Sequence, residues 1–405
     1  MAGLMLICSL GVSCAPGQDL NTRLNSIVRP YHFNFVRWQC NAVFNEAKKL
    51  IFERDKKTDD EISKIKDFFS TTEQMKTLES EIEAIKAGSK QGDSAPLEVE
   101  LNELHQQKAT LESLAERIIE RQIRETLSQQ GIFNPIHRYI GFKIGFPPVN
   151  FKLEAPPHLL IISPRDRIES MREIVLRKAL NLEEKESIEA EADELGISSL
   201  VVELGGFGGT YPTFVTDKAS LQFTLDAAAE EWLHQYLAFK PLGFRYLLDL
   251  TGISRNYEIA TMNETVAGMV AKEIGSLVYE SYYTQLENEE NQSEAPVSGF
   301  DFSLEMRNIR RAVDSYLAQG EIEQAEEFME QKRQFLATKG YNIRKLNQAY
   351  FAFHGAYADR PTSISPIGRE LKELRNQSAS LKDFLEKAAA MTSHQNLVDS
   401  LKQGS

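Results

Sequence analysis

The strongest constraint on the fold is the spacing of apolar residues within residues 59–130. Apolar side chains recur three and four residues apart among Glu and Lys, in two runs that the segment AGSKQGDSAP separates. This period is typical of amphipathic helices, and a Gly/Ser/Pro segment is typical of a turn. The sequence therefore predicts an antiparallel helical hairpin. Its apolar stripe is sparse, which favours an arm that projects from the rest of the protein.

Beyond the hairpin the pattern changes to a short extended region and then returns to helix. Proline clusters in FPPVNFKLEAPPHLLIISP exclude helix, and the run at 159–162 indicates a strand. Two more extended pieces are expected at 200–204 and 213–216. Helices are expected at 166–194, from 227 onward, and at 262–286, 303–319, 321–339 and 342–359, with a terminal helical piece after RPTSISPIG. The prediction is an α+β fold that is mainly helical, with a small β region next to the helix that starts near residue 227.

Length and charge limit the organisation and the partners. A chain of 405 residues with 42% hydrophobic residues can bury a large core in two or three units. The expected units are a signal or anchor segment (1–20), a helical region with the hairpin (21–135), a core that carries the candidate site (136–290) and a C-terminal helical domain (291–405). The net charge of -13 and the absence of a basic cluster argue against a nucleic-acid partner.

The N-terminal run MAGLMLICSLGVSCAPGQ predicts export and membrane anchoring. It is too short to span a bilayer, but it suits the apolar region of a secretory signal. Small residues before Cys14 resemble the lipid attachment site of bacterial lipoproteins, so we expect a protein anchored on the extracytoplasmic face. After such cleavage only Cys40 remains besides the anchor, which leaves no internal disulfide. The alternative is an apolar N-terminus that is simply packed or disordered.

The stretch AAAEEWLHQYL at 227–237 carries the first candidate site residues. On a helix, Glu230 and His234 project from one face, four residues apart, and Glu231 points slightly aside. This spacing lets one helix offer two ligands to a metal ion, with a third side chain aimed at a metal-bound water. Many surface helices carry the same spacing without a metal, so the motif needs a further ligand.

The third candidate ligand is Glu264, in the stretch TMNETVAGMVAKEIG. Val266, Ala267, Met269 and Val270 follow it and are typical of a buried helix. A carboxylate in such surroundings needs a cation or a set of donors, because removing it from water without a partner is costly. A metal ion would be that partner.

Together the two stretches resemble the gluzincin metallopeptidases, in which a helix with H-E-x-x-H precedes a helix with a Glu ligand in an NE context. The resemblance covers roughly residues 199–366, since LNQAYFAFHGAYAD is also similar to a helix of certain bacterial aminopeptidases. It implies one zinc ion bound by His234 and Glu264, with Glu231 as general base. Glu230 stands where the family has its first His ligand. A carboxylate can ligate zinc, but it makes the metal a weaker Lewis acid.

The resemblance also implies substrate-binding and oxyanion-stabilising residues. A strand beside the gluzincin cleft pairs with the substrate backbone, and LGGFGGTYPTFV takes that place here. The implied substrate-binding residues are Gly205, Gly206, Gly208 and Tyr211. The donor to the oxyanion is expected to be Tyr350, with His354 as the alternative. The implied reaction is hydrolysis of a peptide bond in a peptide or protein substrate.

Three other functions were weighed. The segment GGFGGT is followed by Tyr211 and proline rather than by a helix start, which argues against a nucleotide site. A di-iron site needs two E-x-x-H motifs, but the sequence has only the one formed by Glu231 and His234, which argues against such a site. The remaining competitor is a catalytically inactive, peptidase-like and membrane-anchored scaffold protein whose helical hairpin binds a protein partner.

Overall fold

The computed structural model describes residues 18–33, 60–86, 91–133, 147–284, 300–355 and 363–403. Cys14 and Cys40, and with them the predictions of lipid attachment and cleavage, lie outside these residues. The described part is mainly helical with two small three-stranded sheets, so the expected α+β class is confirmed. Each helix in the described ranges is too short or too polar to cross a bilayer.

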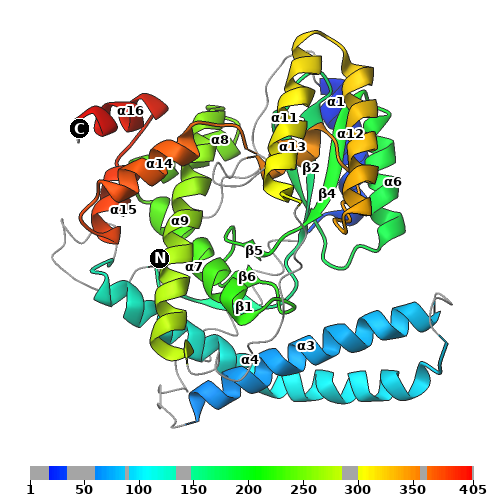
Figure 1. Ribbon diagram of the computed structural model, residues 1–405, viewed down its shortest axis with the longest axis vertical. Coiled ribbons are helices and arrows are strands. Elements are labelled where there is room, and N and C mark those ends of the chain that lie inside the picture. Colours follow the sequence, from blue (N-terminus) through cyan, green and yellow to red (C-terminus); the bar gives the residue numbers. More distant parts are fainter. Residues whose placement is uncertain are drawn as a thin grey trace.

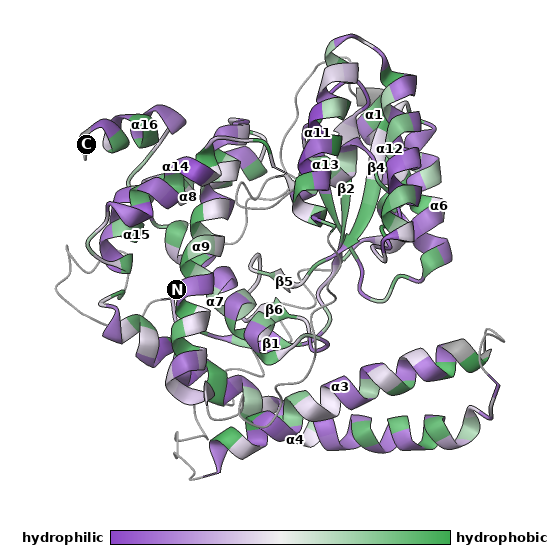
Figure 2. Cartoon of the chain, viewed as in Figure 1, coloured by the Kyte–Doolittle hydropathy of each residue, from purple (hydrophilic) through white to green (hydrophobic). Residues whose placement is uncertain are grey.

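The predicted helical hairpin is present and lies along the bottom of the molecule in Figure 1. Its two helices are α3 (Glu61–Lys86) and α4 (Ala95–Gln129). At the base, Phe68, Ile119 and Ile123 are fully buried in the largest apolar core. Toward the tip the ribbons extend away from both sheets, and apolar and polar residues alternate along them (Figure 2).

The largest apolar core is enclosed by a group of helices, here called the helical body. A small three-stranded sheet also contributes side chains to this core. The helices of the helical body are α7 (Leu221–Leu237), α8 (Pro241–Leu250), α9 (Tyr257–Tyr282), α14 (Ile367–Asn376), α15 (Leu381–Ala389) and α16 (His394–Gln403), with the base of α4. Its sheet has the order β1-β6-β5, from β1 (Phe151–Leu153), β5 (Gly206–Phe207) and β6 (Thr213–Val215). β1 runs parallel to β6 and β5 antiparallel to it, so β5 is an edge strand beside α7.

A second group of elements, here called the sheet body, packs around the other three-stranded sheet, whose strand order is β3-β2-β4. The strands are β2 (His158–Pro164), β3 (Arg172–Leu176) and β4 (Ile197–Glu203), and both neighbours are antiparallel to β2. The helices are α1 (Gln18–Val28), the 3-10 turn η1 (Arg29–Tyr31), α6 (Leu182–Asp193), α11 (Phe302–Ala318), α12 (Ile322–Thr338) and α13 (Gln348–His354). Figure 2 shows β2 and β4 as strongly apolar, which fits strands that helices cover on both faces.

Several of the expected helices have other bounds in the structure. The predicted helix at 166–194 was wrong in its first half, because β3 occupies Arg172–Leu176 and only Leu182–Asp193 is helical. Ile174 and Leu176 are buried on alternate positions, as a strand requires. Within the described residues, the helix predicted at 342–359 is present only as α13, whose start is capped by Asn347; residues 356–359 lie outside the description. The helix expected from 262 begins five residues earlier, at Tyr257, where the Asn256 side chain accepts a hydrogen bond from the Ile259 N–H.

Ion pairs join segments that are distant in sequence. In the sheet body, Arg344 donates twice to Glu189, at 2.5 and 2.8 Å, and the Glu189 side chain is 4% exposed. In the helical body, His394 lies between Glu370 (2.5 Å) and Glu258 (3.2 Å). Burial lowers the pKa of His394, but its hydrogen bonds and charge interactions with the two carboxylates outweigh burial, so its pKa is raised.

Candidate metal centre

The centre lies between α7 and α9, the two longest helices of the helical body after α4, which pack against each other. Helix α7 starts at Ser220, whose hydroxyl accepts a hydrogen bond from the Phe223 N–H, and it buries an Ala- and Trp-containing face. The Trp232 indole donates to the Pro147 carbonyl at 2.7 Å. A Cβ at Gly275 of α9 would lie 1.9 Å from Asp226 Oδ1 and 3.2 Å from the Asp226 backbone nitrogen on α7, so the glycine leaves the space for this contact between the helices.

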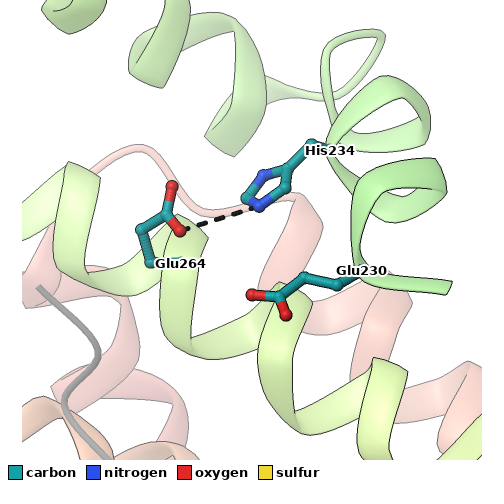
Figure 3. Close-up of side chains that lie close together, drawn as sticks. All are labelled: Glu230, His234 and Glu264. Atoms are coloured by element: carbon teal, nitrogen blue, oxygen red, sulfur yellow. Dashed lines mark ion pairs between the residues drawn. The ribbon is translucent and has the colours of Figure 1, made fainter. Parts of the chain in front are cut away.

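The structure brings Glu230, His234 and Glu264 together. Each offers one ligand atom, and these atoms lie within 4.8 Å of one another. Glu230 and His234 come from neighbouring turns of α7, and Glu264 comes from the second turn of α9 (Figure 3). His234 Nε2 is 3.6 Å from Glu264 Oε2. Two carboxylates and an imidazole on two rigid helices form a donor set suited to a divalent cation.

Two side chains that the sequence reasoning had not assigned hold these ligands. The Tyr246 hydroxyl on α8 donates to Glu264 Oε1 at 2.5 Å. Asn263 Nδ2 lies 3.1 Å from His234 Nδ1, while Asn263 Oδ1 is buried and has no hydrogen-bond partner in the described part of the chain. A reversed Asn263 amide would accept the proton of Nδ1 and leave Nε2 free for a cation. The orphaned oxygen therefore fits a metal-bound state of His234.

Glu231 follows Glu230 on α7 and lies against the glycine turn that comes after β4. A Cβ at Gly206 would lie 2.3 Å from Glu231 Oε1, and a Cβ at Gly208 would lie 2.5 Å from Oε2. The glycines thus leave the space that the carboxylate occupies. The pKa of Glu231 is raised well above its ordinary value by burial, then by the charges of Glu230 and Glu264, and a hydrogen bond from the Gly208 backbone opposes the shift. Because the charges of Glu230 and Glu264 act on Glu231, a cation bound between Glu230 and Glu264 would relieve this repulsion.

Two of the predicted substrate-binding residues, Gly206 and Gly208, lie beside this carboxylate. Gly206 belongs to the edge strand β5, and Gly205 and Gly208 flank it. Gln235 of α7 donates to the Thr210 carbonyl at 2.9 Å, which ties the segment that leads to Tyr211 to the same helix. An edge strand can pair with an extended peptide, and here it lies next to the half-buried carboxylate of Glu231.

Tyr350 and His354 lie on α13, which packs against β2 and β4 of the sheet body. Their rings are 4.3 Å apart, and Tyr350 also packs among apolar side chains of that body. These contacts place them beside a different sheet from the one that borders α7, so a catalytic role for Tyr350 stays a prediction. The tyrosine that the structure does bring to the three candidate ligands is Tyr246.

Comparisons with protein-family models, with curated proteins and with solved structures found no match to this chain.

Proposed function

We propose that this protein is a zinc-dependent peptidase with a gluzincin-like site. The observation that carries the proposal is the convergence of Glu230, His234 and Glu264 within 4.8 Å, together with the half-buried carboxylate of Glu231, on which Glu230 and Glu264 act. Surface helices often show the E-x-x-x-H spacing, but they seldom meet a buried third carboxylate from another helix. The centre is made of three groups that attract a cation and one that can accept a proton.

In this proposal the three ligands hold one zinc ion, which when bound lowers the pKa of a coordinated water and polarises the scissile carbonyl. Glu231 accepts the proton of the attacking water and passes it to the leaving amine. A raised pKa suits this role, because it makes the carboxylate a stronger proton acceptor. The two carboxylate ligands neutralise the charge of the dication, so the expected turnover is lower than with two His ligands.

The substrate is a peptide that lies extended along β5. Its backbone would pair with the edge of the β1-β6-β5 sheet at Gly206, which brings a peptide bond close to Glu231. Tyr246 positions Glu264 by donating to it and keeps the ligand in place as the charge at the centre changes.

Two matched variants test the assignment. Glu231→Gln should keep the zinc content of the wild type and abolish hydrolysis of a quenched fluorescent peptide library, because it removes the base but no ligand. Glu264→Gln should lower the zinc content. Equal zinc in wild type and Glu264→Gln would remove Glu264 from the ligand set. Replacing Glu230 by His should raise activity if the native site is a weakened form of the two-His centre.

The second candidate function is a membrane-anchored scaffold without catalysis, in which the α3–α4 hairpin binds a protein partner. The observation that favours it is the hairpin itself, which extends away from both bodies (Figure 1). It predicts that excess zinc fails to bind and that Glu231→Gln changes no function of the protein.

A further inference from the structure

Exposed apolar side chains gather on one short segment of the helical body. Thirteen large apolar residues of the described chain are exposed, and six of them fall between residues 239 and 257. These six are Phe239, Phe244, Leu247, Leu250, Ile253 and Tyr257, with exposed fractions from 39% to 68%. Single exposed apolar residues are ordinary, but a cluster of this size marks a binding surface.

The cluster follows the outer face of α8. Phe244, Leu247 and Leu250 recur every three residues along this helix, and all three are exposed. The opposite face carries Leu242 and Asp249, which are buried, and Tyr246, which contacts Glu264. Helix α8 therefore presents an apolar stripe to solvent although its inner face is already packed against α9. Figure 1 shows α8 at the upper end of the helical body.

The charges of this segment are basic, in contrast to the chain as a whole. Between residues 239 and 257 the charged side chains are Lys240, Arg245, Asp249 and Arg255. Asp249 is 7% exposed, and one of its oxygens accepts the Asn256 N–H at 2.6 Å. Arg245 and Arg255 are exposed. Although the chain has a net charge of -13, the exposed apolar cluster at 239–257 is thus flanked mainly by positively charged side chains.

We propose that this α8 surface, residues 239–257, docks on a membrane that contains anionic lipids. Apolar side chains flanked by Lys and Arg are the features by which a helix lies in the membrane interface, with its apolar face among the acyl chains and its cations at the headgroups. A two-fold contact with a second copy would place Arg245 near its own counterpart and oppose like charges. The lipid surface offers the complementary charge.

The docking surface and the candidate centre share one helix. Tyr246 reaches Glu264 from the inner face of α8, so docking would hold the centre about one helix diameter, roughly 10 Å, from the lipid. The proposal does not depend on catalysis or on zinc. It adds a second membrane contact to the lipid anchor expected at the N-terminus, and stable attachment generally needs two such signals.

Vesicle binding of the full chain tests the proposal. Phe244→Trp places a fluorescent reporter in the surface, and wild type gives the background of the other tryptophans. Vesicles of brominated phosphatidylglycerol and phosphatidylcholine should quench the added emission, whereas Leu182→Trp on α6, where the residue is also 57% exposed, should show no added quenching. The paired change Phe244→Ser with Leu247→Ser should lower vesicle affinity at least about tenfold. It should leave the melting temperature unchanged, because both residues are exposed.

Two results would overturn the proposal. One is equal quenching of the two tryptophan reporters, which would assign any membrane binding to another part of the chain. The other is concentration-dependent dimerisation that the paired serine variant abolishes, together with no quenching at Phe244→Trp, which would make the surface an interface between copies. Vesicles of phosphatidylcholine alone should bind more weakly, and about 0.5 M salt should remove that difference.

Discussion

Gly206→Ala isolates the contact between the glycine turn and Glu231. The Cβ that this change adds would lie 2.3 Å from Glu231 Oε1 and 2.9 Å from its Cγ. Contacts of a Cβ below 3.0 Å essentially never occur. The Glu231 oxygen must therefore move by at least 0.7 Å, which is the difference between this 3.0 Å limit and the 2.3 Å contact. Glu231 is a flexible side chain, and it can make this move at little cost to the fold.

The expected consequence is a loss of activity without a loss of stability. Displacing a catalytic group by about 1 Å costs on the order of 100-fold in rate. We therefore expect Gly206→Ala to lower kcat/KM about 10- to 100-fold, which corresponds to about 1.4 to 2.7 kcal/mol of transition-state stabilisation. The assay is hydrolysis of a peptide that the wild type cleaves, with zinc content and melting temperature measured on the same samples.

The double variant Gly206→Ala with Glu231→Gln is the control. If the alanine acts through Glu231, the double variant should be no slower than Glu231→Gln alone, because the base is already lost. Additive losses, or an unchanged kcat/KM in Gly206→Ala, would refute the reasoning that the glycine exists to seat the carboxylate.

Three further predictions concern ligand support and stability. Tyr246→Phe removes the donor to Glu264, so the zinc dissociation constant in a chelator competition should rise about 10-fold; an unchanged constant would deny Tyr246 this role. The raised pKa of His394 means that its stabilisation is complete below pH 6.5, its ordinary pKa, and is lost as pH rises through the higher folded value. Melting temperature should fall over that range, and His394→Gln should flatten the fall; a parallel fall in the variant would contradict the assignment. Arg344→Met leaves the buried Glu189 carboxylate with weaker partners, so urea unfolding should show a loss of about 2 to 3 kcal/mol, and a loss below about 0.5 kcal/mol would contradict this.

The sequence predicted those features that periodicity and turn chemistry determine locally. The hairpin followed from three-and-four spacing, and the strand at 159–162 from its apolar run between prolines. The candidate ligands Glu230 and His234 followed from the geometry of one helix. Glu264 followed from the cost of burying a charge among apolar neighbours, and its 9% exposure confirms that it is buried.

What the sequence could not provide depends on contacts between distant segments. Strand β3 is only five residues long and begins with Arg172 and Glu173, so its pattern could be read as part of a helix until β2 is there to pair with it. Helix α8 was missed because its apolar residues face outward, although Pro241 is a signal for its start. Tyr246 then could not be placed at the centre. The space that Gly206 and Gly208 leave for Glu231 is visible only once α7 packs beside β5.

The most direct test of the metal centre is the zinc content of the protein, measured by mass spectrometry after purification without chelators or metal-affinity resin. We predict about one zinc per chain in the wild type, and much less in Glu264→Gln purified in parallel. Absence of zinc from the wild type even after incubation with excess zinc, while the protein remains folded, would contradict the proposed centre.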